Sequence, residues 1–368
     1  MGIKRFSICL VLIFTILSAC TAGATSPPGI PPTPAATGVT EVATFESPDP
    51  TQPATPAATG TQTPIPQVTL AAVGDIMLAR TVGDQLLAQG PQIVFAGVQS
   101  VLDSADIRVG NLECALTNRD TPEKKSFPLK APPQAAQALA LAKFDLVSLA
   151  NNHSMDYGYA GLADTQAALN QMDIATLGAG LQAAAAHAPV FIERNGLRLA
   201  FLAYADVMPE NSGFDTHTWI ATHSRPGIAW ADPDQIRADV TAAKRQVDVV
   251  VVMLHSGYEI NSTVSLNQRT AAYAAIDAGA ALVLGSHPHI LQSIQPYHGG
   301  LIAFSLGNFV FDQYKGILNA TIILRVVLDR SGFLSYDYVP VLIENGLPVL
   351  TPIDTVRGIE TLVAPPNP

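Results

Sequence analysis

Val247-Asp-Val-Val-Val-Val-Met-Leu-His255-Ser-Gly257 and Ala281-Leu-Val-Leu-Gly-Ser-His287-Pro-His289 are two apolar runs that each lead into histidine. Runs of this kind predict strands that are buried on both faces, as in the parallel sheets of α/β proteins. Such sheets bind their ligands in the loops beyond the carboxyl ends of the strands. The three histidines are therefore expected together at one edge of a sheet, where neutral imidazoles can bind a metal ion.

Three upstream segments repeat this arrangement of a strand followed by polar residues. Asp75 follows residues 68–73, Glu113 follows residues 107–109, and Asn152-His153 follows residues 146–150. Five strand ends thus carry Asp, Glu, Asn and His. This mixture of oxygen and imidazole ligands suits Mn, Fe or Zn better than Ca or Mg, and it is large enough to bind one or two ions.

Each of these residues alone also fits a structural role. Asp75 fits a helix cap or a turn as well as a ligand, Asn152 fits a turn, and His255 fits a hydrogen-bonded core histidine. Two imidazoles around a proline, as in His287-Pro288-His289, seldom serve packing. Taken together, the residues favour a metal site, because polar and titratable groups cluster at functional sites.

Strand-like and helix-like segments alternate along the chain, which predicts an α/β fold with a mostly parallel sheet covered by helices. Residues 320–328 and 333–341 flank Arg330-Ser331-Gly332 and predict a hairpin at a sheet edge. The other predicted strands are 68–73, 107–109, 146–150, 197–204, 247–254, 281–284 and 301–305; the predicted helices are 134–143, 162–171, 234–245 and 266–278.

The ordered series of motifs resembles that of the CapA (poly-γ-glutamate capsule synthesis) proteins. The resemblance extends from about residue 68 to about residue 340. The motifs are Gly74-Asp-Ile-Met-Leu-Ala-Arg80, Gly110-Asn-Leu-Glu113, Leu149-Ala-Asn-Asn-His153 with Asp156-Tyr-Gly158, His255-Ser-Gly-Tyr-Glu259, Gly285-Ser-His-Pro-His289 and Ser305-Leu-Gly-Asn-Phe309.

That family is in turn similar to calcineurin-like metallophosphoesterases, which implies a four-layer α/β/β/α sandwich here. The resemblance also implies that His153 assists the leaving group and that Glu113 bridges two metals. Met77 departs from the pattern, because metallophosphoesterases usually have histidine there. The positions that match metal ligands are Asp75, Glu113, Asn152, His255, His287 and His289.

The amino-terminal residues predict export from a bacterial cell. Lys4 and Arg5 precede an apolar run over residues 8–17, which is too short for a comfortable membrane span. Leu17-Ser-Ala-Cys20 is similar to a lipobox, which implies cleavage before Cys20 and acylation of that residue, so that lipid anchors the protein to the membrane. The alternative is an ordinary secretory signal in which Cys20 is incidental.

The sequence divides into four parts: a signal peptide at 1–20, a disordered linker at 21–67, a folded domain at 68–345 and a tail at 346–368. The linker holds 11 prolines and 11 threonines and no lysine or arginine, so it cannot build a core and predicts a semi-rigid tether. With 20 basic against 30 acidic residues and no basic cluster beyond Lys124-Lys125, nucleic acid is not expected as a partner.

Five further residues are weaker candidates for substrate binding. Trp219 and Arg225 lie in residues 206–232, a long stretch without periodicity that indicates either a binding loop or a loop packed over the sheet. Arg80 and Lys130 lie near the first two motifs and fit either an anion site or a solvated surface. Asn308 follows a strand and either reaches the cleft or makes the turn.

Two function classes follow from these residues. The first is a lipid-anchored, metal-dependent hydrolase of the bacterial cell envelope, which cleaves a phosphoester or amide bond of an anionic capsule polymer or its precursor while His153 assists the leaving group. The second is a non-catalytic scaffold that binds the polymer or the membrane subunits of a capsule synthase, and Met77 favours it. A surface binding protein with no link to capsule is also compatible, because fold does not fix function.

Overall fold

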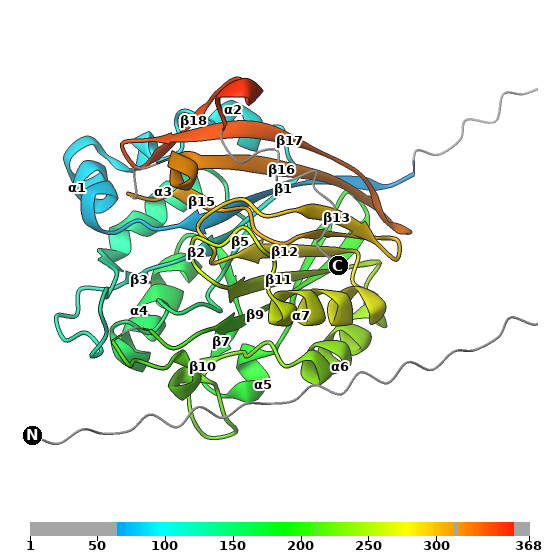
Figure 1. The fold of residues 1–368 in the computed structure, drawn as a ribbon, viewed down its shortest axis with the longest axis horizontal. Helices are drawn as coiled ribbons and strands as arrows, with labels where there is room; N and C mark the ends of the chain where they lie inside the picture. Colours follow the sequence, from blue (N-terminus) through cyan, green and yellow to red (C-terminus); the bar gives the residue numbers. More distant parts are fainter. Residues whose placement is uncertain (1–64, 211, 313–315, 357–368) are drawn as a thin grey trace, which may run out of the picture. The chain divides into compact units, whose positions relative to one another are not determined.

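Two β-sheets pack face to face, and helices cover their outer faces (Figure 1). The computed structural model describes residues 65–210, 212–312 and 316–356. The predicted signal peptide with Cys20, most of the predicted tether and the last part of the predicted tail lie outside the described residues. Among the helices of the described residues, none is long and apolar enough to cross a membrane.

The first sheet has eight strands in the order β18-β17-β16-β1-β2-β5-β6, with β15 also paired to β1. The pairs among β1, β2, β5, β6 and β15 are parallel, and β16 to β18 continue the sheet as antiparallel strands. Their bounds are β1 Gln67–Ile76, β2 Ile107–Leu112, β5 Leu146–Ser148, β6 Ala175–Leu177, β15 Asn308–Val310, β16 Ala320–Asp329, β17 Gly332–Glu344 and β18 Leu347–Leu350.

The second sheet has six strands in the order β13-β14-β12-β11-β9-β8. Its four central strands are parallel and its two edge strands are antiparallel to their neighbours. Their bounds are β8 Val190–Arg194, β9 Leu197–Val207, β11 Val249–Gly257, β12 Leu282–Ser286, β13 Ile294–Tyr297 and β14 Gly300–Ala303. The alternation of strand-like and helix-like segments predicts a mostly parallel sheet. The strands instead form two large mixed sheets, as the four-layer sandwich implied by the resemblance requires.

Both faces of strand β11 pack in hydrophobic cores, which explains the nearly continuous apolar run at 247–254. Val249, Val251 and Met253 belong to the core that includes the first sheet. The alternate residues, such as Val250 and Val252, pack instead in a second core with helices α6 (Pro233–Lys244) and α7 (Leu266–Asp277). Both faces of the strand are therefore buried, as expected for the centre of a parallel sheet.

Helices on the other side complete the sandwich. These are α1 (Arg80–Gln89), α2 (Gln99–Leu102), α3 (Ala136–Leu141) and α4 (Gly158–Asn170), whose buried residues join the core of the first sheet. Phe95 packs there against Phe144 and Phe309, with ring centroids 5.2 Å and 6.3 Å apart. The predicted four-layer α/β/β/α sandwich is confirmed.

Short elements fill the connections. These are α5 (Ala183–Ala186), the strands β3 (Ala115–Leu116), β4 (Lys130–Ala131), β7 (Ala179–Gly180) and β10 (Gly227–Ile228), and 3-10 turns at Pro91–Ile93, Pro133–Ala135, Thr216–Trp219, Gly316–Asn319 and Ile353–Thr355.

The carboxyl-terminal hairpin forms as predicted, but it does not end the sheet. Asn345 and Gly346 have φ angles of 52° and 86°, which are typical of a tight two-residue turn between antiparallel strands. This turn leads into β18, which pairs with β17 and becomes the sheet edge. Ordered structure therefore continues beyond residue 345, where the sequence predicts the start of a tail.

Candidate metal centre

The carboxyl ends of β1, β2, β11 and β12 bring their polar residues to one place between the sheets. Asp75 lies beside Asn111 and Asn308 in the first sheet, and His255 lies beside Ser286 in the second. The backbone N–H of His287 donates to Oδ2 of Asp75 at 3.1 Å, which joins the two sheets at this point.

All six predicted metal ligands are buried in this region. Oδ1 of Asp75 lies 3.6 Å from Nδ1 of His255, and its Oδ2 lies 3.6 Å from Nδ1 of His289. Nε2 of His289 lies 3.8 Å from Oε1 of Glu113. Ligand atoms of Asp75, Glu113 and His289 all lie within 4.8 Å of one another. The six residues are Asp75, Glu113, Asn152, His255, His287 and His289.

Two of these side chains have buried polar atoms that lack hydrogen-bond partners among the described residues. Both carboxylate oxygens of Glu113 are buried and unpaired, and so is Nδ1 of His287. A buried carboxylate without a partner is costly, and a cation removes that cost. These atoms, the mixed oxygen and nitrogen donors and the short separations fit a divalent metal ion.

Burial and neighbouring charges set the protonation of the centre. Burial raises the pKa of Glu113 well above its usual range, and the charge of Asp75 adds to the rise. Burial also raises the pKa of Asp75, but the hydrogen bond and charge of His255 outweigh it and leave that pKa low. Burial lowers the pKa of His287 well below its usual value, and the charges of His255 and His289 lower it further. At neutral pH Asp75 is thus ionised and His287 is neutral, as metal binding requires.

Asparagines hydrogen-bond to the predicted ligands, and one of them, Asn152, is itself a predicted ligand. Nδ2 of Asn111 donates to Asp75 at 2.8 Å, and Oδ1 of Asn308 lies 2.8 Å from Nδ1 of His289. Oδ1 of Asn152 accepts from Nε2 of His255 at 2.8 Å. Partners of this kind fix the ring orientation of metal-binding histidines. Asn111 belongs to one of the sequence motifs. Its hydrogen bond to Asp75 joins two strands, and the sequence does not predict which strands are neighbours.

A histidine–aspartate pair lies beside the ligands. Nδ1 of His153 is 2.7 Å from Oδ2 of Asp156, and its Nε2 is 3.9 Å from Oε1 of Glu113. The backbone N–H of His153 donates to Oδ1 of Asn151 at 2.9 Å, which fixes its position further. A histidine held in this way can give or take a proton next to the candidate metal position. Sequence reasoning missed Asp156 as its partner.

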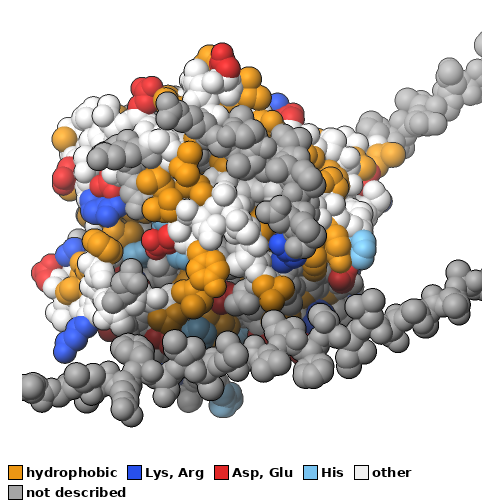
Figure 2. Space-filling model, in the orientation of Figure 1, with side chains coloured by type: hydrophobic (Ala, Val, Ile, Leu, Met, Phe, Trp, Pro, Cys, Tyr) orange, Lys and Arg blue, Asp and Glu red, His pale blue; other side chains and the backbone are white. Residues whose placement is uncertain are grey.

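A cavity of about 210 Å³ opens onto these groups. His153 and His287 line it, and the exposed side chains of Phe127, Met208 and Tyr258 lie around it. In the space-filling view, histidine side chains are visible in a hollow beside acidic and hydrophobic ones (Figure 2). No lysine or arginine is among the described residues that line the cavity.

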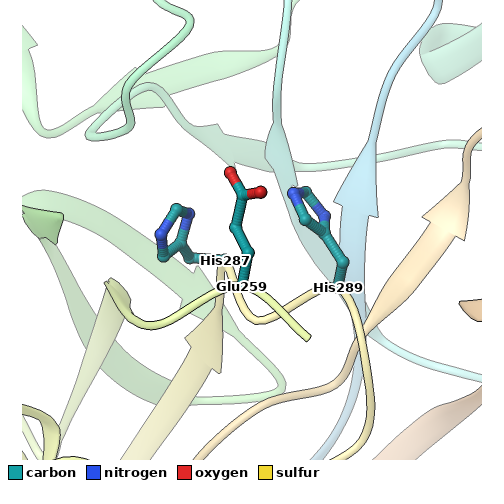
Figure 3. A group of neighbouring side chains, drawn as sticks. All are labelled: Glu259, His287 and His289. Carbon is teal, nitrogen blue, oxygen red and sulfur yellow. The ribbon is translucent and has the colours of Figure 1, made fainter. Parts of the chain in front are cut away.

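Glu259 is a further carboxylate at the centre that sequence reasoning missed as a ligand. It comes from the loop after β11, and its carboxylate lies between the rings of His287 and His289 (Figure 3). Ligand atoms of these three residues lie within 4.8 Å of one another.

Comparison with known proteins identifies the family. Residues 69–313 match the family model described as "Bacterial capsule synthesis protein PGA_cap". The chain belongs to this PGA_cap family. It is 34% identical over 290 residues to "Capsule biosynthesis protein CapA" of Bacillus anthracis, a match that covers 77% of this chain and 69% of that protein. It is 31% identical over 288 residues to "PGA biosynthesis protein CapA" of Bacillus subtilis (strain 168), covering 77% and 74%. The predicted resemblance to the CapA proteins is confirmed.

The fold of this PGA_cap protein is also similar to solved structures. One is a 5′-nucleotidase from Candida albicans SC5314, which is 10% identical with a TM-score of 0.41; the match covers 73% of this chain and 50% of that one.

Four of the weaker candidates lie elsewhere in this PGA_cap protein. Arg80 pairs with Asp312, and Lys130 pairs with Asp120 at 2.9 Å. Trp219 is buried and packs on Phe214, and the exposed Arg225 donates to the carbonyl of Ile220 at 3.2 Å. None of the four lines the cavity described above. Arg80 and Lys130 are near the motifs in sequence only, and the loop that carries Trp219 and Arg225 packs these two residues on other parts of the protein. Asn308, in contrast, lies at the centre.

Lys125 has a wholly buried side chain beside the histidine–aspartate pair. Its Nζ lies 2.9 Å from Oδ1 of Asp156 and 3.0 Å from Oε1 of Glu210. It also lies 5.4 Å from the ring of Phe214 and 5.1 Å from that of Trp219. Lys125 therefore links Asp156, which contacts His153, to Glu210 in another loop that lines the cavity.

Replacing Lys125 by methionine should destabilise the protein by about 3–5 kcal/mol, because it leaves the Asp156 carboxylate buried without its cation. The free energy of unfolding, measured by denaturant titration, is the test. The exposed neighbour Lys124 provides a matched control, and Lys124→Met should change the stability by no more than about 0.5 kcal/mol. Equal stability of the two variants would contradict the structural role of Lys125.

Cys114 adjoins Glu113 but takes no part in the centre. It is a free, buried cysteine, and burial raises the pKa of its thiol to about 12. It is therefore a protonated, inert core residue at neutral pH.

Proposed function

We propose that this chain is a metal-dependent hydrolase, anchored by lipid to the bacterial cell envelope, that cleaves a phosphoester or amide bond of an anionic capsule polymer. Poly-γ-glutamate or its precursor is the proposed substrate, since the relatives are named for capsule and PGA biosynthesis. The observation that carries the proposal is the buried Glu113 carboxylate, which has no hydrogen-bond partner among the described residues and whose Oε1 lies 3.9 Å from Nε2 of His153.

The six buried ligands would hold one or two ions of Mn, Fe or Zn. A divalent ion supplies Lewis acidity, which polarises an ester or amide and lowers the pKa of water. Asp156 holds Nδ1 of His153, so that Nε2 faces the centre. Burial lowers the pKa of His153, so Nε2 must first take up a proton before the ring can donate it to the leaving group. Because no lysine or arginine lines the cavity among the described residues, an anionic substrate relies on the metal for charge compensation.

The proposed anchor rests on Lys4, Arg5, the apolar run at 8–17 and Cys20. Expression with a labelled fatty acid in a bacterial host should label the unsubstituted chain and should fail to label Cys20→Ala, because acylation needs the cysteine sulfur. Ser18→Ala is a control that keeps the small residue and should still be labelled. Labelling that persists in Cys20→Ala would contradict the anchor and favour an ordinary secretory signal.

A second candidate function is a scaffold that binds the polymer or membrane subunits of a capsule synthase without catalysis. The exposed apolar side chains around the cavity favour it, since Phe127, Met208 and Tyr258 are 71%, 53% and 48% exposed. Exposed apolar groups that gather on one surface are typical of partner-binding sites.

Elemental analysis and hydrolysis assays on the purified full chain distinguish these functions. A hydrolase should contain near-stoichiometric Mn, Fe or Zn, cleave phosphoester or γ-glutamyl amide substrates, lose this activity with a chelator and regain it with added Mn²⁺. Bound metal without hydrolysis of either substrate class would favour the scaffold. Absence of metal, also after reconstitution, would refute the hydrolase.

A further inference from the structure

Glu259 differs from the other acidic residues of the centre because it is exposed, whereas Asp75 and Glu113 are buried. Its carboxylate faces His287 and His289, within 4.8 Å of their ligand atoms (Figure 3). It therefore adds an oxygen donor on the solvent side of the centre. An exposed carboxylate alone is not evidence of a metal site. The contacts that hold the Glu259 loop and the side chains around its carboxylate therefore decide its role.

The backbone holds the Glu259 loop against the two histidines. The N–H of Ile260 donates to the carbonyl of Pro288 at 2.9 Å, and Pro288 is the residue between His287 and His289. Ile260 has a φ of 56°, and His287 and His289 have φ angles of 95° and 59°. β-branched residues rarely adopt this left-handed conformation, which persists only where the surroundings fix it and which clusters at ligand sites.

Two buried glutamines hold the same loop from inside. Nε2 of Gln292 donates to the carbonyl of Asn261 at 2.8 Å, and Nε2 of Gln268 donates to Oε1 of Gln292 at 2.8 Å. Gln268 also packs under Gly257, where an added Cβ would approach its side chain to 2.6 Å. The loop is thus ordered before any ligand arrives, which is the condition for a precise metal ligand.

His287 provides an independent sign of a missing partner. Its Nδ1 is buried and has no hydrogen-bond partner among the described residues. Nδ1 of His289 is instead occupied by Asn308, which leaves Nε2 of that ring for a ligand. An unpaired imidazole nitrogen in the interior is unfavourable, and an ion shared with Glu259 removes the deficit.

We propose that Glu259 is a metal ligand that, together with His287 and His289, closes the centre on its solvent side around a divalent ion such as Mn²⁺ or Zn²⁺. This assignment rests on the proposed function, since both require metal binding. It adds a seventh ligand to the six that the sequence predicts.

Titration of the full chain with Mn²⁺ and Zn²⁺ against a competing chelator tests the assignment. Glu259→Gln should weaken ion binding by at least about tenfold, because a direct ligand costs no less than an orienting partner. Glu344→Gln, which changes an exposed glutamate on β17, should bind as the unsubstituted chain does. The visible spectrum of the Co²⁺-loaded protein should change in Glu259→Gln alone, because that spectrum reports the ligand set.

The outcomes separate this assignment from the proposed function. If Glu259→Gln and the unsubstituted chain bind ions equally well, the Glu259 assignment falls and the metal site stands. If binding weakens but the Co²⁺ spectrum is unchanged, Glu259 acts through its charge and is not a ligand, which also overturns the assignment. If the unsubstituted chain binds neither ion, the assignment and the proposed function fall together.

Discussion

Replacing His287 by alanine should prevent metal binding at the candidate centre and abolish the proposed hydrolysis. Nδ1 of His287 is buried and has no hydrogen-bond partner in the described part of the chain, and the His287 ring lies 4.7 Å from that of His255. Because loss of an orienting partner already costs 10–100-fold in metal affinity, loss of this ligand should cost more than about 100-fold. Elemental analysis of the purified variant should find less than about a tenth of the metal of the unsubstituted chain.

His298→Ala is the matched control for this prediction. His298 is exposed and pairs with Asp277 at 2.8 Å, so its loss should change neither metal content nor turnover. The metal-free His287→Ala protein should remain folded, because Nδ1 of His287 makes no hydrogen bond among the described residues that the change would break. Retention of full metal content and turnover by His287→Ala would refute the centre.

The strands that carry the centre were predictable because a strand that is buried on both faces appears in the sequence as a nearly continuous apolar run. Residues 247–254 and 281–284 are apolar on both faces, and β11 and β12 follow them closely. Which sheet each strand joins was not predictable, since pairing depends on contacts between distant residues. Periodicity alone therefore does not divide the strands between two sheets, and only the resemblance to metallophosphoesterases implied that division.

The last strand was missed although its signal was present. Asn345-Gly346 is the dipeptide that favours a tight hairpin turn, and Leu347–Leu350 after it is short and apolar. At four residues, β18 is too short for periodicity to identify it. Pairing with β17 provides the stability that its own sequence lacks.

The site was predictable where its residues end strands and unpredictable where they lie in loops. Asp75, Glu113 and His255 follow apolar runs, and the structure brings them together. Lys125 and Glu259 come from loops. Loops have no periodic sequence pattern from which their paths could be predicted. Arg80 and Lys130 fitted either an anion site or the surface in the sequence, and in the structure they pair with Asp312 and Asp120 and do not line the cavity.

Replacing His153 by alanine should lower the turnover number of the proposed hydrolysis by about 10²–10⁴-fold, the range for a lost general acid. Metal content should stay unchanged, because Nδ1 of His153 is held by Asp156 at 2.7 Å and its Nε2 faces Glu113 at 3.9 Å. The loss should be large for an alkyl leaving group and small for nitrophenolate, which departs without a proton. Steady-state kinetics with the two leaving groups, together with elemental analysis, measure this difference.

His187 offers a matched control because it also pairs with an aspartate, Asp239, at 2.9 Å, and it does not line the cavity. His187→Ala removes a similar contact and should leave the kinetics of both substrates unchanged. If His153→Ala slows both leaving groups by the same factor, then His153 supports the shape of the centre and gives no proton. Dependence on the leaving group would instead place the proton transfer at Nε2 of His153, since Asp156 occupies the other ring nitrogen.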